Sequence, residues 1–224
     1  MTRSLDSQSR ASHSGRTRSV VIFLHGYGAD GPDLLGLADP LGEHLPDTMF
    51  YAPNAPERSV GNPMGFQWFP IPWMDGSTEE EAAQGLLRAA GDLTAYIEEV
   101  SLEAGVEIDQ IALVGFSQGT MMSLHVGPRL EEELACIVGF SGRLVNPEAL
   151  EDELNVRPSV LLIHGDADEV VPPQSLPEAG NALTAAGFEV FAHVSKGMGH
   201  GIAPDGLQVA LAFLRDKLGY DARG

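Results

Sequence analysis

The chain has 224 residues, of which 43% are hydrophobic, and it carries a formal net charge of −19 at pH 7. Length and composition favour one domain with a single substantial core. The negative field repels phosphate backbones and anionic lipid surfaces, which argues against nucleic acid as a partner. The only cysteine, Cys136, lies in the apolar run LACIVGF. An intrachain disulfide is therefore excluded, and a buried free thiol is expected.

The first 18 residues are polar and rich in serine and arginine. We interpret them as a mobile polar arm, or at most as a weak edge strand around residues 3–9, in front of one domain that spans residues 19–224. The arm lacks the apolar stretch of a secretory signal, and no apolar run reaches the length of a membrane span. A cytoplasmic protein is therefore expected.

Short apolar runs then alternate with helical patterns along the chain. Buried strands are predicted at 19–26, 49–53, 110–116, 134–140, 159–165 and 189–194. Helices are predicted at 32–45, 79–103, 118–130, 176–186 and 205–218. Strands that alternate with helices form crossover units, so the sequence predicts an α/β fold with a mainly parallel sheet and helices on both faces.

Residues 54–80 interrupt this alternation. The segment is rich in proline and glycine and contains both tryptophans, so we expect neither a helix nor an interior strand there. A long connection of this kind in a compact domain is often functional. Its apolar residues are either the wall of a substrate site or the surface of a homodimer.

The pentapeptide Gly115-Phe116-Ser117-Gln118-Gly119 stands where a predicted strand becomes a predicted helix. It matches the G-x-S-x-G nucleophile elbow, in which a serine sits on a strained turn between small neighbours. The turn lifts the hydroxyl above the sheet and directs the free N–H groups of the helix start at a developing negative charge. Ser117 is therefore the candidate nucleophile.

A serine needs a base, and the base needs an orienting acid. His200, in the glycine-rich loop between the last predicted strand and helix, fits the chain order Ser, acid, His. Two acids compete after the strand at 159–165. Asp168 is favoured because it reaches further towards the histidine loop, whereas Asp166 is closer to the strand and could cap the turn instead.

An oxyanion hole requires two N–H donors. The backbone N–H of Gln118 directly follows the nucleophile and is the first candidate. The second is the backbone N–H of Tyr27, in the loop HGYGADG after the first predicted strand. The glycines of that loop allow close backbone approach, although they could equally serve only to make a turn.

Five motifs in order, VIFLHGYGADG, APNAP, LVGFSQGTMMSLH, HGDADEVVP and GMGHGI, resemble the phospholipase/carboxylesterase family of α/β-hydrolases. This family includes acyl-protein thioesterases and bacterial carboxylesterases. The resemblance covers about residues 19–218 and implies an α/β-hydrolase fold. It places the nucleophile, acid and base on Ser117, Asp168 and His200, and the oxyanion donors on Tyr27 and Gln118. The chain departs from many relatives at Thr120, where they have glycine, and at Glu169, where they have proline.

We therefore expect a serine carboxylesterase that hydrolyses short- to medium-chain esters through an acyl-enzyme, without a metal or organic cofactor. The substrate is a small ester or acyl thioester, and the residues expected to line its groove are Phe66, Trp68, Phe69 and Trp73. An acyl-protein thioesterase or a lysophospholipase would use the same site, and a peptidase is less favoured. Outside enzymes, the alternative is a non-catalytic hydrolase-like binding protein.

Overall fold

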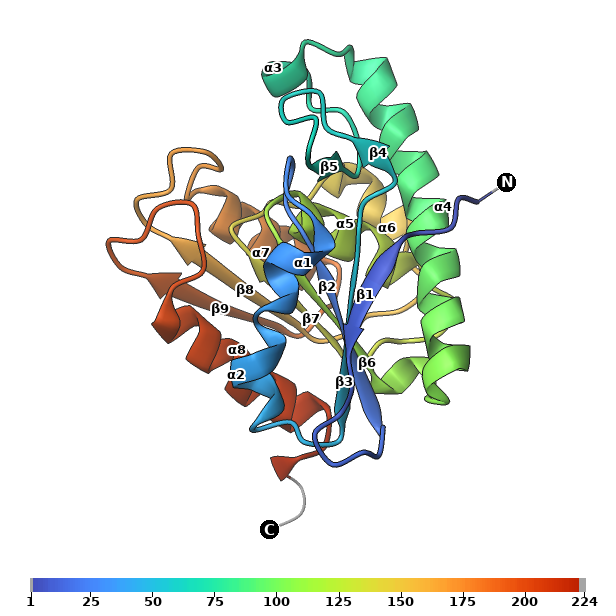
Figure 1. Ribbon diagram of the computed structural model, residues 1–224. Coiled ribbons are helices and arrows are strands. Elements are labelled where there is room, and N and C mark those ends of the chain that lie inside the picture. Colours follow the sequence, from blue (N-terminus) through green and yellow to red (C-terminus); the bar gives the residue numbers. More distant parts are fainter. Residues whose placement is uncertain (1, 222–224) are drawn as a thin grey trace.

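A computed structural model describes residues 2–221, which form a seven-stranded sheet with helices on both faces (Figure 1). The sheet order is β1-β3-β2-β6-β7-β8-β9. Strand β1 is antiparallel to β3, and the other pairs are parallel. The strands are β1 (Ser7–Arg10), β2 (Ser19–Leu24), β3 (Thr48–Pro53), β6 (Ile111–Phe116), β7 (Cys136–Phe140), β8 (Val160–Gly165) and β9 (Val190–Ser195). Each predicted strand is present within two residues of its expected ends.

The direction of strand addition reverses at β2. From β2 the chain first adds β3 on one side, and it then returns to add β6 to β9 on the other side. In open parallel sheets, ligands bind outside the carboxyl ends of the strands at such a reversal. The loops that follow β2 and β6 begin at His25 and Ser117. The topology therefore marks the ends of these two strands as the place to look for a site.

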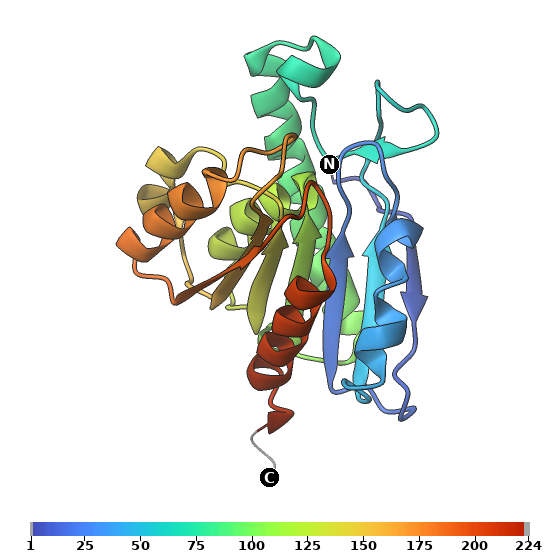
Figure 2. The same ribbon diagram turned by 90° about the vertical axis from the view of Figure 1, so that its left-hand side faces the viewer.

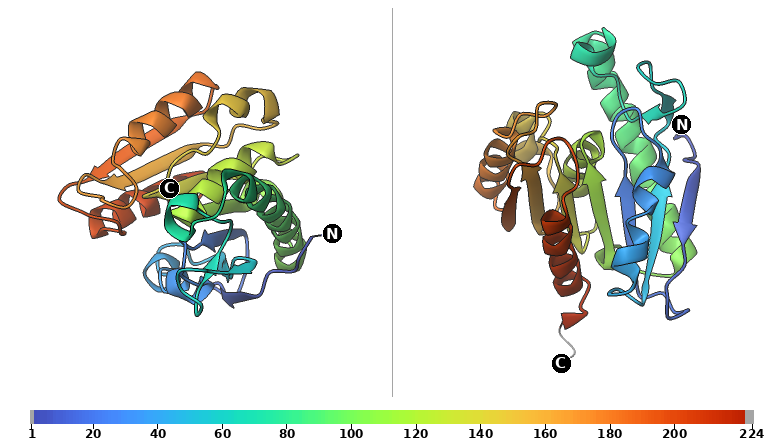
Figure 3. Two further views of the ribbon diagram at one scale, coloured as in Figure 1. Left: turned by 90° about the horizontal axis from the view of Figure 1, so that it is seen from above. Right: turned by 60° about the vertical axis from the view of Figure 1, so that its left-hand side comes forward.

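Helices cover the two faces of the sheet, and each face has its own apolar core. One core joins the sheet to α4 (Glu79–Ala104), α5 (Gln118–Val126) and α7 (Ser175–Ala185), and the other joins it to α1 (Gly31–Leu35), α2 (Ala38–Gly42) and α8 (Pro204–Lys217). Figures 2 and 3 show the sheet between these two sets of helices. Cys136 lies buried and unbonded in the second core, as predicted. Within residues 2–221, even the longest helix is not apolar enough to cross a membrane.

Two predicted helices are shorter than expected. The helix predicted at 32–45 is divided into α1 and α2, and Pro40 explains the division because its ring nitrogen cannot donate to a carbonyl one turn earlier. Helix α5 ends at Val126, and a 3₁₀ turn over Gly127–Arg129 follows, where Pro128 likewise lacks a donor. A further short helix, α6 (Leu150–Glu153), was not predicted.

The segment 54–80 has more regular structure than its composition suggested. It contains a two-residue hairpin, β4 (Glu57–Arg58) with β5 (Phe66–Gln67), and a short helix α3 (Pro72–Asp75). Its prolines are compatible with both elements because they lie outside the paired residues or, at Pro72, at the first helical position. In Figure 1, β4, β5 and α3 project beyond one edge of the main sheet, beside the start of α4.

The polar N-terminal arm is docked on the domain and contains the edge strand β1. Arg3 anchors the start of the arm, with its Nε 2.8 Å from Asp92 Oδ2 and its guanidinium 3.1 Å from Glu57. The side chain of Asp92 is only 3% exposed, so this ion pair is partly withdrawn from water. The structure thus has the edge strand that the sequence offered as the alternative to a mobile arm, at Ser7–Arg10, and paired charges join the start of the arm to α4 and β4.

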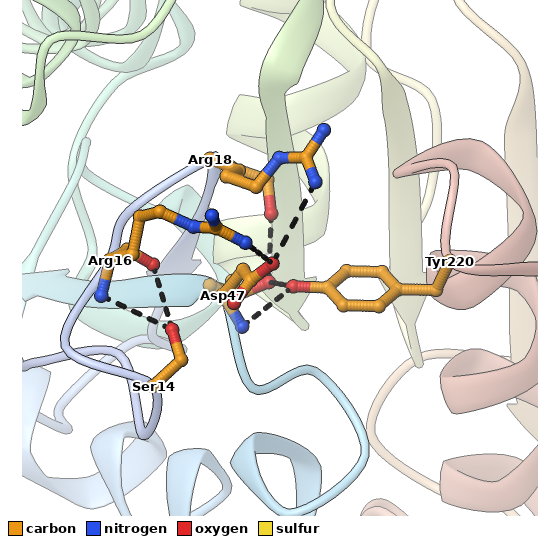
Figure 4. A network of polar contacts seen from close by, with 7 residues as sticks. Ser14, Arg16, Arg18, Asp47 and Tyr220 are labelled. Carbon is orange, nitrogen blue, oxygen red and sulfur yellow. Dashed lines mark hydrogen bonds and ion pairs between the residues drawn. The ribbon is translucent and has the colours of Figure 1, made fainter. Parts of the chain in front are cut away.

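A second polar network joins the end of the N-terminal arm to the segment that follows α8, near the residue that precedes β3 (Figure 4). Tyr220 Oη accepts from the backbone N–H of Asp47 at 3.0 Å and lies 2.9 Å from Thr48 Oγ1. Arg16 and Arg18 place their guanidinium nitrogens 3.5 and 3.9 Å from Asp47 Oδ2. The network therefore joins the end of the arm, the start of β3 and the segment after α8.

Candidate active site

Ser117 occupies a strained turn between β6 and α5. Its backbone has φ 53° and ψ −113°, a region that costs a non-glycine residue about 1–3 kcal/mol. The turn is held from both sides, because Ser117 N–H donates to Phe140 O at 2.8 Å and Ser117 O accepts from Met121 N–H at 3.2 Å. The side chain is not fully buried, since the residue is 9% exposed. This is the geometry that the G-x-S-x-G pattern predicts.

The two glycines of the motif are required by close backbone contacts. A Cβ atom on Gly119 would lie 1.8 Å from Leu24 O, and one on Gly115 would lie 2.4 Å from the backbone nitrogen of Thr120. Thr120, a departure from the family pattern, is accommodated because its hydroxyl bonds to the carbonyl oxygens of Gly115 and Phe140 at 2.9 and 2.8 Å. Its larger side chain therefore braces the elbow.

Asp168 and His200 meet at the same edge of the sheet. His200 Nδ1 lies 2.8 Å from Asp168 Oδ2, and the other carboxylate oxygen accepts the N–H groups of Val170 and Val171 at 2.9 Å each. Burial acts to raise the pKa of Asp168, but the hydrogen bonds from His200, Val171 and Val170 together hold it below its ordinary value. Asp168 is thus an ionised acid placed against an imidazole.

Asp166, the competing acid, has a different role. Its Oδ1 accepts the backbone N–H of Gly197 at 2.6 Å, so it closes the loop that leads to His200. Its side chain is exposed, whereas Asp168 is 4% exposed. The alternative that Asp166 stabilises a turn therefore matches its contacts in the structure.

The imidazole of His200 also packs beside the elbow. Its ring centroid lies 4.9 Å from that of Phe116, the residue that directly precedes Ser117. Within residues 2–221, a hydrogen bond joins His200 to Asp168, and none joins His200 to Ser117 Oγ. In free enzymes such contacts are often long and tighten only when substrate binds. The structure thus brings acid and base together and leaves the nucleophile nearby but unbonded.

The two candidate oxyanion donors lie at the ends of β2 and β6. A Cβ atom on Gly26 would lie 3.3 Å from Ser117 Cβ, so the loop after β2 passes directly beside the nucleophile. Among the hydrogen bonds of residues 2–221, neither Tyr27 N–H nor Gln118 N–H has an acceptor. The loop is held from behind, because Gly28 N–H donates to Phe66 O at 2.8 Å. Two N–H groups are therefore available on braced backbone beside Ser117.

The four aromatic residues predicted to line the substrate groove separate into two groups. Phe69 and Trp73 line a cavity of about 130 Å³ together with residues of α4 and of the loop after β7, which contribute both apolar and polar side chains. Trp68 does not line this cavity, and its predicted role needs correction. Its side chain is fully buried and its indole N–H donates to His25 O at 3.0 Å. Phe66 faces the Arg58 guanidinium, 4.2 Å from its ring, and is not part of the cavity wall.

Gln118 connects this wall to the nucleophile elbow. Its side-chain oxygen accepts Trp68 N–H at 2.9 Å, and its side-chain nitrogen donates to Phe69 O at 2.7 Å. The residue is fully buried. The same residue therefore presents its backbone N–H towards the candidate oxyanion site and fixes the aromatic segment with its side chain. The sequence motif indicated only the first of these features.

Among the same aromatic residues, Trp73 is the strongly exposed one, at 59%, and Met74, next to it in the chain, is 49% exposed. The Arg143 guanidinium lies 4.6 Å from the centre of the Trp73 ring. A homodimer through this surface stays a prediction.

Two buried histidines also support the site, through contacts that the sequence did not predict. His25 Nε2 accepts Ala55 N–H at 2.9 Å, and its Nδ1 lies 2.8 Å from Gly26 O, so the ring braces the loop that carries Tyr27. Burial lowers the pKa of His25, which keeps the ring neutral. His164 lies beside Asp168. Their only sequence signal was a position just before a glycine at the end of a strand.

Comparisons with known proteins agree with this architecture. The family model for phospholipase/carboxylesterase matches residues 7–218. Acyl-protein thioesterase 1 of Gibberella zeae is 28% identical over 214 residues, which cover 89% of this chain and 91% of the relative. Esterase YpfH of Escherichia coli is 30% identical over 203 residues, which cover 88% of this chain and 82% of that protein.

Among solved structures, esterase PE8 superposes with a TM-score of 0.90 at 43% identity, and the match covers 96% of this chain and 100% of that one. Acyl-protein thioesterase 2 of Zea mays, at 23% identity and a TM-score of 0.77, shares the fold. The predicted α/β-hydrolase fold and the resemblance to esterases and thioesterases are thereby confirmed. The chain belongs to the phospholipase/carboxylesterase family of hydrolases.

Proposed function

We propose that this protein is a serine carboxylesterase in which Ser117 is the nucleophile, His200 the general base and Asp168 the acid that orients the base. The observation that carries the proposal is the 2.8 Å hydrogen bond between His200 Nδ1 and Asp168 Oδ2, at the sheet edge where Ser117 stands on its strained turn. A nucleophile, an imidazole and an ionised acid at one edge are the parts that acyl transfer requires.

In the proposed reaction, His200 takes the proton of Ser117 as the hydroxyl attacks the ester carbonyl. Asp168 fixes the imidazole with its protonated Nδ1 towards the carboxylate and stabilises the positive charge that forms. The backbone N–H groups of Tyr27 and Gln118 bind the oxyanion, and one such donor contributes about 10²–10³ in rate. His200 then protonates the leaving alcohol, and water releases the acid from the acyl-enzyme by the same route.

The cavity beside Phe69 and Trp73 is the proposed acyl site. Its volume of about 130 Å³ and the apolar part of its lining, with Ile71, Ala82 and Leu86, suit a short to medium acyl chain, and Glu79, Arg143 and Asn146 add polar groups to the wall. Ser117 and His200 do not line the cavity, but Phe69 does, and its carbonyl oxygen accepts from Gln118 Nε2 at 2.7 Å. An acyl chain held there would therefore have its carbonyl end near the elbow.

A thioesterase acting on acylated proteins is the second candidate function. It is favoured by the relatives that carry the name acyl-protein thioesterase, which align with about nine-tenths of this chain. A lysophospholipase would use the same catalytic groups. A non-catalytic binding protein is less well supported, because such a protein has no use for a strained serine turn or for the Asp168–His200 pair.

The test is hydrolysis of p-nitrophenyl esters and the matching acyl thioesters over a series of acyl lengths, with wild-type protein and the Ser117→Ala variant. We expect the wild type to prefer short or medium acyl groups and the variant to lose at least 10³-fold in kcat. Stoichiometric labelling by a fluorophosphonate should disappear in parallel. The matched control is Ser123→Ala, which removes a buried hydroxyl of the same helix that donates to Gly119 O. Substantial hydrolysis by folded Ser117→Ala would refute the proposal.

A further inference from the structure

A second histidine contacts the acid of the proposed active site. His164 lies near the end of β8 and its side chain is 2% exposed. Its Nε2 lies 3.0 Å from Val171 O and 3.3 Å from Asp168 Oδ2. A carbonyl oxygen can only accept, so the proton of the neutral ring is on Nε2 and points at Val171. The same N–H edge therefore faces both the turn after Asp168 and the carboxylate itself.

The contacts of Val171 show what His164 holds in place. Val171 N–H donates to Asp168 Oδ1 at 2.9 Å, and Val171 O accepts from His164. Val171 is thus fixed on both sides of its Cα atom, between the carboxylate and the imidazole. Val170, next to it, is 54% exposed and offers little packing to hold the turn. The turn that orients the Asp168 carboxylate is therefore held by the His164 hydrogen bond together with the buried side chain of Val171, which packs in the core.

The charge distribution points to the same pair of histidines. Among residues 2–221, the imidazoles within 4.0 Å of the Asp168 carboxylate are those of His164 and His200, and Oδ2 is hydrogen-bonded to His200. The side chain of Asp168 is completely withdrawn from solvent. The Nε2–H of His164 is used by Val171 O, so His164 acts on the carboxylate through the Val171 turn, while its ring lies beside Oδ2 at 3.3 Å.

We propose that His164 is a positioning residue for the reaction, which orients the Asp168 carboxylate by holding the Val171 turn that donates to its Oδ1. This inference rests on the proposed function, because Asp168 and His200 must act together on Ser117. His164 touches neither the nucleophile nor the cavity lined by Phe69 and Trp73. Its loss should therefore lower kcat and leave KM nearly unchanged, since the acid–base pair acts at proton transfer.

The experiment compares His164→Leu, His164→Asn and His164→Gln in the full chain. Leucine removes the ring N–H, asparagine offers an N–H too short to reach Val171 O, and glutamine can place its Nε2 near the position of the imidazole Nε2. We expect His164→Leu and His164→Asn to lose about 10-fold or more in kcat, with KM within about threefold of wild type, and His164→Gln to recover most of the rate. Comparable kcat for the asparagine and glutamine variants overturns the proposal, whether or not His164→Leu folds.

Two further readouts separate positioning from a merely structural role. Without His164 the Val171 turn holds the Asp168 carboxylate less firmly against His200, so the carboxylate stabilises the imidazolium less and the acid limb of the kcat/KM profile should move to lower pH in His164→Leu. The matched control is His125→Leu, which removes another buried histidine from α5. That control should leave the limb in place, and an unmoved limb in His164→Leu overturns the proposal.

The second readout is the low-field proton NMR resonance of the hydrogen bond between His200 Nδ1 and Asp168 Oδ2, assigned by its loss in Asp168→Asn. It should shift in His164→Leu or His164→Asn and remain near its wild-type position in His125→Leu. An unchanged resonance in both His164 variants contradicts the inference. This measurement does not require turnover, so it tests the role of His164 separately from the proposed function. Absence of esterase activity in the wild-type protein would refute the proposed function, and the resonance would still decide the role of His164.

Discussion

Replacing Gln118 by leucine removes two buried hydrogen bonds at the centre of the proposed site. Trp68 N–H and Phe69 O would lose partners that now lie 2.9 and 2.7 Å away. A buried polar group without a partner costs about 1–3 kcal/mol, so the two groups together cost roughly 2–6 kcal/mol. We expect a loss of about 3 kcal/mol, because the wall beside the cavity can move and admit water to Phe69 O.

In a domain of this size, 1 kcal/mol corresponds to about 2–4 °C in Tm, so Gln118→Leu should unfold roughly 6–12 °C below wild type. Thermal unfolding followed by circular dichroism measures this. Gln118→Glu is the informative partner, because its carboxylate can still accept from Trp68 N–H but places negative charge against Phe69 O. The backbone N–H of residue 118 remains in both variants. In both variants KM should therefore rise while kcat changes little, because the wall of the acyl cavity becomes less ordered.

The matched control is Gln84→Leu, on the exposed side of α4, where the side chain bonds only to the nearby Glu80. It should change Tm by about 1–2 °C or less, since surface substitutions are usually within 0.5 kcal/mol. If Gln118→Leu unfolded as the control does, the side chain would not hold the wall. A wild-type KM for medium-chain esters in that variant would contradict the coupling to the cavity.

Two further predictions concern stability. Burial lowers the pKa of His125 to about 4, with a smaller effect from the charge of Arg129, whereas the unfolded chain binds this proton near pH 6.5. The free energy of unfolding should therefore fall by about 2 kcal/mol from this group as pH drops from about 6.5 towards 4. The urea midpoint of His125→Gln should decline less steeply with pH than that of wild type over this range. Equal slopes for the two proteins would contradict the prediction. Gly119→Ala should not give folded protein, because its Cβ would meet Leu24 O at 1.8 Å. Gly180→Ala, in α7 with open space around it, should instead stabilise by about 0.5–1 kcal/mol, as soluble yield and Tm would show.

Much of the fold was predictable because its signals are local. The runs at 19–26 and 110–116 contain consecutive apolar residues, at 20–24 and 111–114, which is typical of strands buried on both faces, and these strands form as β2 and β6. The strained turn at Ser117 could also be predicted from a few neighbouring residues. Gly115 and Gly119 stand where nearby backbone atoms leave no room for a Cβ atom. The order of Ser117, Asp168 and His200 along the chain then selected one histidine for the base.

The contacts between distant segments depended on the tertiary structure. Trp68 and Trp73 lie five residues apart in the same proline-rich stretch, yet one is buried under the elbow and the other is 59% exposed. Nothing in the local sequence separates them, because their burial depends on where α4 and α5 pack. The same holds for His200, whose hydrogen bond with Asp168 joins residues 32 positions apart in the chain. Sequence alone thus determined the strands and the serine turn, since backbone sterics and apolar runs act over a few residues. Only the three-dimensional packing decided which side chains brace the acid and the cavity wall, because those contacts depend on how remote segments come together.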